Sequence, residues 1–233
     1  MIKWLIHQFK VRVKGINDPL EKRFQTIYNS NYWGSKESKS GVGSEIKVTS
    51  VILKEISRVI NQYNITKVVD APCGDFNWIR NLDFSKIEYL GLDIVKPLIE
   101  KLQIEYTSEK NIHFKYSNII EDEIPNADLV ICRDCLVHFS YADIENFIRG
   151  LRNSRTKYLL TTSFSNRLEN NDIITGDWRP LNLMIAPFNF GEPVEVINEK
   201  YKGDNGRFID KSMLLFDVSK LPESIIKSED NNN

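Results

Sequence analysis

Between residues 45 and 163 the hydrophobic positions alternate between helical and strand spacing. Apolar residues three or four positions apart predict one helix over 45–63 with Ser44 as its N-cap, a second with Pro97 in its first turn, and a third that starts at a Ser140/Asp143 capping box. Short apolar runs between the helices predict strands, at 67–71, 88–93, 112–116, 127–132 and 157–162. This alternation predicts βαβ units and a mainly parallel sheet.

The segments around this region have different patterns. Strand patterns at 194–199 and 213–218 follow each other without a long helix, which predicts an antiparallel hairpin at the sheet edge. We expect three parts: an N-terminal helix and irregular lid segment over 1–44, a main domain over 45–221, and a disordered tail over 222–233. The N-terminal helix would carry Trp4, Leu5 and Phe9 on one side. The main domain would include a long polar insertion at 164–190.

Charge and cysteine content narrow the classes of function. The 233 residues include 31 Lys and Arg against 32 Asp and Glu, so no overall basic field favours nucleic acid as a substrate. No apolar run approaches the roughly 20 residues of a membrane-spanning helix, so we expect no stable membrane insertion. Three cysteines, an odd number, do not suggest a disulfide framework and favour the cytoplasm. The sequence makes no prediction of the oligomeric state.

The loop after the first predicted strand suggests the kind of ligand. It has one glycine, Gly74, and two carboxylates, Asp70 and Asp75, whereas a pyrophosphate loop uses bare backbone N–H groups and avoids anions. The loop therefore suits a nucleoside with a cationic end and no phosphate, and S-adenosylmethionine fits that description. Asp93 ends the second strand, where a carboxylate can accept both ribose hydroxyls. Asn118 follows the third strand and could meet the adenine amino group.

These segments resemble a known family. Residues 69–75 with 90–93, and residues 128–139, look like motifs of the class I S-adenosylmethionine-dependent methyltransferases. The resemblance covers about 45–218 and implies an α/β, Rossmann-like three-layer sandwich with a seven-stranded, mostly parallel sheet and an antiparallel last strand. Pro72 departs from the family, which usually has a glycine there. The residues expected to contact the cofactor are Trp33, Ser38, Asp70, Pro72, Gly74, Asp75, Trp78, Asp93, Ile94, Asn118, Ile119 and Arg133.

A second, narrower resemblance concerns the molecule that would accept the methyl group. Residues 32–44 and 175–183 look like signatures of a bacterial and viral subgroup associated with surface-glycan and sugar modification. The 164–190 insertion follows the fifth strand and should lie over the same end of the sheet. Its mixture of aromatic, amide and charged side chains suits a polyol or sugar phosphate, and the residues expected to bind the acceptor are Asp177, Trp178, Arg179 and Asn182. The segment 33–44 could close over the cofactor.

Methyl transfer to a hydroxyl needs a positioned nucleophile and a base. His138 is the candidate base, and Asp134, four residues earlier, shares its face if the stretch is helical. Asp134 could then orient His138 or bind the methionine ammonium. Arg133 could pair with the methionine carboxylate or an acceptor anion. An amine acceptor could be neutral already and need no base, so a hydroxyl or amine of a small molecule or glycan remains open.

Three other interpretations compete with this one. A nicotinamide-dependent oxidoreductase could use a similar sheet, although the single glycine and the Asp75 carboxylate argue against it. A non-catalytic S-adenosylmethionine-binding partner protein is also open. Cys132 and Cys135 form a C-x-x-C pair that could bind zinc with Cys73 and His138, but there is no second such pair and we expect no metal.

Overall fold

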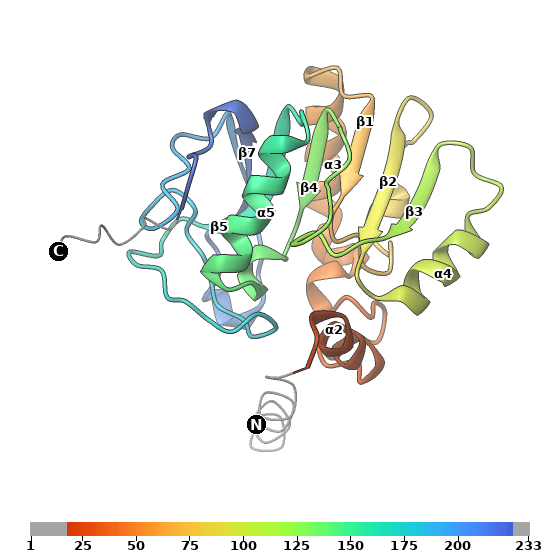
Figure 1. Cartoon of the computed structure of the whole chain (residues 1–233), viewed down its shortest axis with the longest axis horizontal. Coiled ribbons are helices and arrows are strands. Elements are labelled where there is room, and N and C mark those ends of the chain that lie inside the picture. Colours follow the sequence, from red (N-terminus) through yellow and green to blue (C-terminus); the bar gives the residue numbers. More distant parts are fainter. Residues whose placement is uncertain (1–17, 226–233) are drawn as a thin grey trace.

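The sheet has the predicted class. The structure, a computed structural model, describes residues 18–225, so the helix predicted from Trp4, Leu5 and Phe9 lies outside the described residues. Seven strands form one sheet in the order β3-β2-β1-β4-β5-β7-β6, and β7 runs antiparallel to the other six (Figure 1). The strands are β1 (Lys67–Asp70), β2 (Glu88–Asp93), β3 (Ile112–Tyr116), β4 (Leu129–Cys132), β5 (Tyr158–Phe164), β6 (Glu195–Asn198) and β7 (Lys211–Asp217).

Each strand follows from its hydrophobic run. All four residues of the central strand β4 are buried, as a strand covered on both faces requires. The predicted hairpin is confirmed, because β6 pairs antiparallel with β7. Strand β7 lies between β5 and β6, so β6 rather than β7 forms the edge. This order places the carboxyl ends of β1, β2 and β4 together at the centre of one edge of the sheet.

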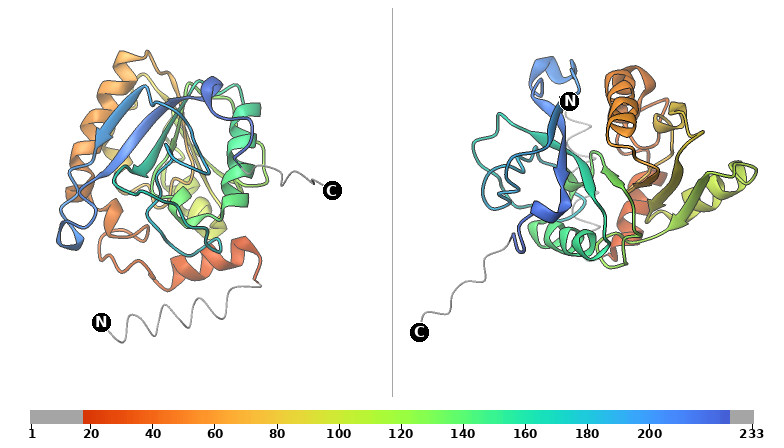
Figure 2. Two further views of the ribbon diagram at one scale, coloured as in Figure 1. Left: turned by 90° about the vertical axis from the view of Figure 1, so that its left-hand side faces the viewer. Right: turned by 90° about the horizontal axis from the view of Figure 1, so that it is seen from above.

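Helices cover both faces of the sheet (Figure 2). Helices α3 (Ile46–Gln62) and α4 (Lys96–Glu105) pack their buried residues into one core cluster, and α5 (Tyr141–Asn153) packs into another on the opposite face. Pro97 lies in the first turn of α4, as predicted. The Rossmann-like three-layer sandwich is therefore confirmed. No helix within residues 18–225 has the length and apolar character needed to span a membrane.

Two predicted helix starts differ in detail. Ser44 is not the N-cap of α3: it lies in a short 3-10 helix, Val42–Ser44, and the Ile46 N–H donates to the Glu37 carboxylate at 2.8 Å instead. Ser140 does cap α5 by accepting the Asp143 N–H. The reciprocal half of that capping box is absent, because the Ser140 N–H donates to the Thr175 hydroxyl.

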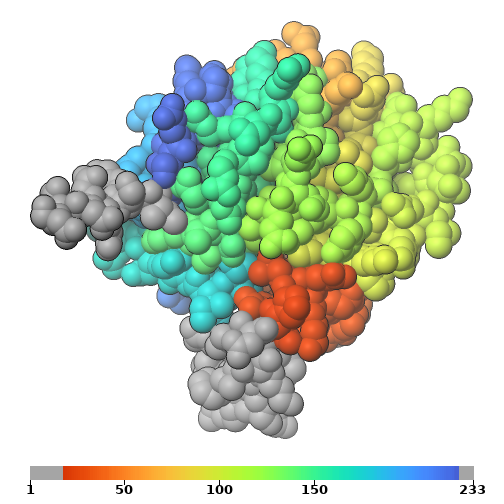
Figure 3. Space-filling view, viewed as in Figure 1, coloured from red at the N-terminus to blue at the C-terminus, as the bar shows by residue number. Residues whose placement is uncertain are grey.

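Residues 18–44 have more regular structure than their sequence pattern suggests. Residues 20–29 form helix α2 (Leu20–Asn29), which lies beside the carboxyl ends of the strands at the bottom of Figure 1. The Arg23 guanidinium donates to the Thr175 carbonyl in the insertion. The space-filling view shows this red segment covering the lower edge, next to the cyan insertion (Figure 3). The segment therefore covers the carboxyl ends of the strands.

The insertion and the tail differ from their predicted character. No helix or strand forms between β5 and β6, but Leu181, Leu183, Phe188 and Phe190 are buried in the main core, so the second half of the insertion is structural. The predicted disordered tail begins too early, because Ile225 is buried in the same core. Residues 226–233 lie outside the described part.

Candidate functional site

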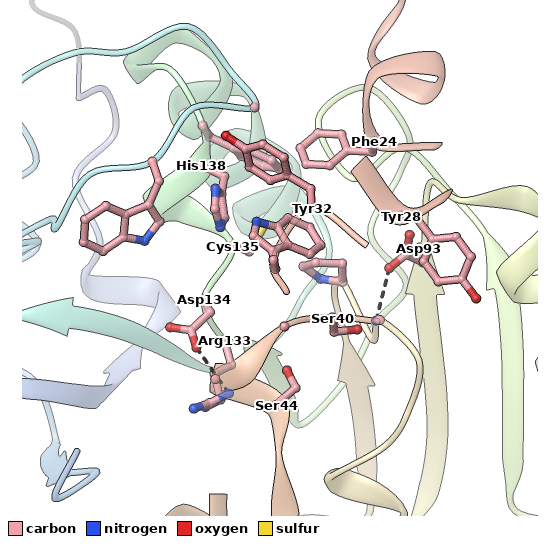
Figure 4. Close-up of a pocket in the computed structure, with 18 of the residues that line it drawn as sticks. Phe24, Tyr28, Tyr32, Ser40, Ser44, Asp93, Arg133, Asp134, Cys135 and His138 are labelled. Carbon is pink, nitrogen blue, oxygen red and sulfur yellow. Dashed lines mark hydrogen bonds and ion pairs between the residues drawn. The ribbon is translucent and has the colours of Figure 1, made fainter. Parts of the chain in front are cut away.

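A large cavity opens at the carboxyl ends of the strands. Its volume is about 760 Å³, within the range of small-molecule sites. Figure 4 shows Asp93 on one side and Asp134 and His138 on the other. The predicted residues that line it are Trp33, Asp70, Pro72, Gly74, Trp78, Asp93, Ile94, Asn118, Ile119, Arg133, Asp134, His138, Asp177 and Trp178. The topology thus brings together residues that the sequence separates by more than a hundred positions.

Asp75 has a different role from the predicted one. Its carboxylate accepts the hydroxyls of Ser38 and Ser40 and the Lys39 N–H, at 2.7–3.1 Å. Neither Asp75 nor Ser38 lines the cavity; Ser40 does. Gly74 permits this contact, because it has a φ of +54° and a Cβ there would lie 2.2 Å from the Ser40 Oγ. The carboxylate therefore fastens residues 38–40, part of the predicted lid over 33–44, onto the glycine loop.

We expect Asp75→Ala to loosen this lid while leaving the fold intact. Loss of several charge-assisted hydrogen bonds removes about 1–3 kcal/mol, so amide hydrogen exchange of residues 36–44 should become about tenfold or more faster. Asp83→Ala is the matched control, since the exposed Asp83 carboxylate bonds locally to Ser85. Equal exchange rates in the two variants would contradict a fastening role for Asp75.

Two buried carboxylates end β1 and β2. Asp70 is 2% exposed and accepts the Tyr89 hydroxyl, and burial raises its pKa to about 7. Asp93 accepts the N–H groups of Gly74 and Val95, and burial raises its pKa to about 6. Within residues 18–225 neither carboxylate lies within ion-pair distance of a Lys or Arg. This end of the cavity therefore suits a ligand that is cationic and rich in hydroxyl donors.

The raised pKa of Asp70 makes a prediction about stability. Its folded pKa exceeds the ordinary value of 3.8, so its ionisation destabilises the folded state as pH rises toward about 7. The stabilisation by Asp70→Asn, measured against the unsubstituted protein, should therefore grow by ~2 kcal/mol between pH 5.5 and pH 8. Urea unfolding at both pH values measures this, and packing effects of the substitution cancel in the difference. A pH-independent difference would show that Asp70 has an ordinary pKa.

Arg133 and Asp134 belong to a buried ionic cluster. The Arg133 guanidinium donates to both carboxylate oxygens of Glu199 at 2.6 and 3.2 Å, and Lys211 Nζ lies 2.6 Å from Asp134 and 3.5 Å from Glu199. Although burial opposes ionisation, Lys211 and Arg133 hold the pKa of Asp134 well below its usual range. The guanidinium of Arg133 is therefore already neutralised, and its predicted pairing with a ligand carboxylate is not supported.

His138 is held by the backbone rather than by Asp134. Residues 136–138 form a 3-10 turn, Asp134 has a φ of +52°, and the predicted shared helical face does not form. His138 Nδ1 lies 2.7 Å from the Asp177 carbonyl, which can only accept, so Nδ1 carries the proton. Burial lowers the pKa of His138 against the opposing effect of that carbonyl. The neutral ring, 5.5 Å from the Trp33 ring, thus keeps an Nε2 lone pair.

The insertion supplies only part of the predicted acceptor site. Asp177 and Trp178 line the cavity, but Arg179 and Asn182 do not. The Arg179 guanidinium donates to the Leu136, Phe139 and Asn171 carbonyls, and the Asn182 amide donates to the Ser165 and Arg167 carbonyls. Both side chains therefore stabilise the insertion itself.

Several lining residues were missed because they are distant in sequence from any motif. They are Leu20, Phe24 and Tyr28 from the N-terminal segment, and Tyr201, Asp204, Arg207, Phe208 and Lys211 before or at the start of β7. Leu20, Phe24 and Tyr28 lie four positions apart, at helical spacing, which was the one available signal. All three cysteines are buried and free, and no group of three or more His, Cys, Asp or Glu among residues 18–225 could hold a metal.

Known structures share this architecture. No protein-family model matches the chain, and neither does any curated protein sequence. Human N-acetylserotonin methyltransferase, solved in complex with S-adenosylmethionine, is 11% identical with a TM-score of 0.55 over 84% of this chain and 56% of that one. The S-adenosylmethionine-dependent methyltransferase SibL, in its apo form, is 12% identical with a TM-score of 0.52 over 72% and 55%. The chain thus spans little more than half the length of either, and it has the Rossmann-like fold of S-adenosylmethionine-dependent methyltransferases.

Proposed function

We propose that this protein binds S-adenosylmethionine and transfers its methyl group to a hydroxyl of a small molecule, with a sugar or glycan precursor as the favoured acceptor. The observation that carries the proposal is the pair of buried carboxylates, Asp70 and Asp93, which line the cavity with no Lys or Arg of residues 18–225 within ion-pair distance. A carboxylate at the end of the second strand is compatible with either nucleotide, but the Asp70 carboxylate at the glycine loop is unfavourable for a pyrophosphate, which disfavours the nicotinamide alternative.

The donor side of the cavity matches an adenosine with a cationic substituent. Asp93 uses its carboxylate to fix the Gly74 loop and keeps lone pairs for the ribose hydroxyls. Ile94 and Ile119 supply apolar surface for the adenine, and Asn118 lies beside them in the lining. When bound, the cofactor supplies an electrophilic methyl group.

The other side of the cavity suits a hydroxyl acceptor. His138 presents a neutral imidazole whose Nε2 lone pair can take the hydroxyl proton, because the Asp177 carbonyl fixes the tautomer. Trp33, packed on that ring, and the lid that Asp75 fastens would exclude water from the transfer. Aromatic Trp178 and Tyr201 beside the carboxylates Asp177 and Asp204 support a polyol ring as the acceptor.

Incubation with S-adenosylmethionine tests the whole proposal. We expect a product heavier by one methylene from at least one member of a panel of sugars, sugar phosphates and nucleotide sugars, detected by mass spectrometry. Amines form a second panel. Methylation of amines alone would overturn the hydroxyl assignment, and oxidation of an acceptor with a nicotinamide cofactor would overturn the methyltransferase assignment.

Asp93 gives a sharper test of the donor site. Asp93→Ala should weaken binding of S-adenosylhomocysteine by about 1–3 kcal/mol, because the ribose loses a charge-assisted hydrogen bond. Isothermal titration measures this. Asp83→Ala, on the exposed loop before β2, is the control and should bind as the unsubstituted protein does. An unchanged affinity of Asp93→Ala would refute the ribose placement.

A further inference from the structure

Two arginines at the acceptor end of the cavity share one aromatic ring. The Arg207 guanidinium lies 5.4 Å from the Phe208 ring centroid, and the Arg167 guanidinium lies 5.8 Å from the same centroid. Arg207 and Phe208 line the cavity, and the Arg167 Nη2 donates to the Arg207 carbonyl. Phe208 is itself held by Phe164 and Trp178, whose ring centroids lie 5.6 and 5.2 Å away. The two cations are therefore placed by a rigid aromatic cluster.

Neither guanidinium is neutralised by a carboxylate. Among residues 18–225 no Asp or Glu oxygen lies within 4.0 Å of Arg167 or Arg207, whereas Arg133 and Lys211 in the same cavity wall are fully paired. The Arg167 Nε is buried and has no hydrogen-bond partner. Arg207 thus presents an unpaired guanidinium at the cavity lining, and an oxyanion bound there would pair with it.

We propose that the acceptor carries one oxyanion group, a phosphate or a carboxylate, which Arg207 binds, while Arg167 contributes a second positive charge from the same Phe208 ring. The guanidinium fork suits either group, because both present oxygen pairs for parallel N–H donors. Asp177 and Asp204 also line this end, so further negative charge on the acceptor would be unfavourable there. The inference rests on the proposed function, since it takes the His138 end as the acceptor end.

Titration of the S-adenosylhomocysteine complex of the full chain tests this inference. The probes are inorganic phosphate, glucose 1-phosphate, glucuronate and the neutral methyl glucoside, each up to the millimolar range. We expect at least one anion to bind, about tenfold or more tighter than methyl glucoside, and Arg207→Gln to remove that preference. Preference for the phosphates over glucuronate, or the reverse, identifies the oxyanion.

Matched variants separate this inference from the proposed function. Arg149→Gln is the control, because Arg149 is an exposed residue of α5 whose guanidinium donates to the nearby Asn146. It should leave anion binding unchanged, and Arg167→Gln should weaken it less than Arg207→Gln does. Equal anion binding by Arg207→Gln and Arg149→Gln, or no anion binding by any protein, overturns the oxyanion site. Failure to bind S-adenosylhomocysteine at all instead overturns the proposed function.

Discussion

Replacing His138 with glutamine is expected to lower kcat by about 10²–10⁴-fold, the usual contribution of a general base, and to leave affinity for S-adenosylhomocysteine unchanged. Glutamine keeps a donor toward the Asp177 carbonyl but has no basic lone pair to take the acceptor proton. Steady-state turnover of an identified acceptor, with cofactor affinity measured separately, checks the result. The matched control is His113→Gln, on an exposed position of β3.

The pH profile gives the same prediction a second readout. Because burial lowers the pKa of His138 below its usual value of 6.5, the base stays deprotonated at neutral pH and kcat should fall only in more acidic solution. His138→Gln should lose this acidic limb. Turnover like that of the unsubstituted protein would remove His138 as the base and favour an amine acceptor that is already neutral.

Replacing Glu199 with glutamine should destabilise the fold by about 3–5 kcal/mol, because it leaves Arg133 with an uncompensated buried charge. The side chains of Arg133 and Glu199 are 3% and 1% exposed, so water cannot replace the lost partner. Asp134 lies 3.3 Å from Arg133 but is already engaged by Lys211. Urea unfolding at neutral pH measures the loss.

An exposed ion pair provides the comparison for Glu199. Glu88 and Lys67 lie 3.3 Å apart with side chains 70% and 58% exposed, so Glu88→Gln should cost about 1 kcal/mol or less. A similar small cost for both substitutions would mean that the buried cluster does not hold β4 to the segment after β6. The cluster would then not be what fixes Arg133 and Asp134 in the cavity wall.

The strands and the donor end of the cavity could be predicted because each depends on local pattern. Continuous apolar runs identified β4, and Asp93 was found because a carboxylate at the end of the second strand must face the ligand edge of a parallel sheet. The predictions for cofactor residues that do not end a strand were less accurate. Asp75 has the expected position, but its carboxylate is satisfied by Ser38 and Ser40, which no local pattern reveals.

The rest depends on contacts between distant segments. Glu199 lies 66 positions from Arg133, so an isolated arginine in the motif looked available for a ligand. Arg179 likewise looked available to bind the methyl acceptor, because its partners are distant in the sequence. In the structure its guanidinium N–H groups donate to backbone carbonyls of the loop before α5. Arg207 and Phe208 belong to no recognisable sequence motif. They reach the cavity because β7, which follows them in the chain, pairs with β5.

Isothermal titration of the unsubstituted protein with S-adenosylhomocysteine and, separately, with an oxidised nicotinamide dinucleotide addresses the carboxylate-lined cavity most directly. We predict one molecule of S-adenosylhomocysteine bound per chain, with Asp93→Ala weaker, and no detectable dinucleotide binding. Saturable binding of the dinucleotide, or no heat from S-adenosylhomocysteine, would contradict the account.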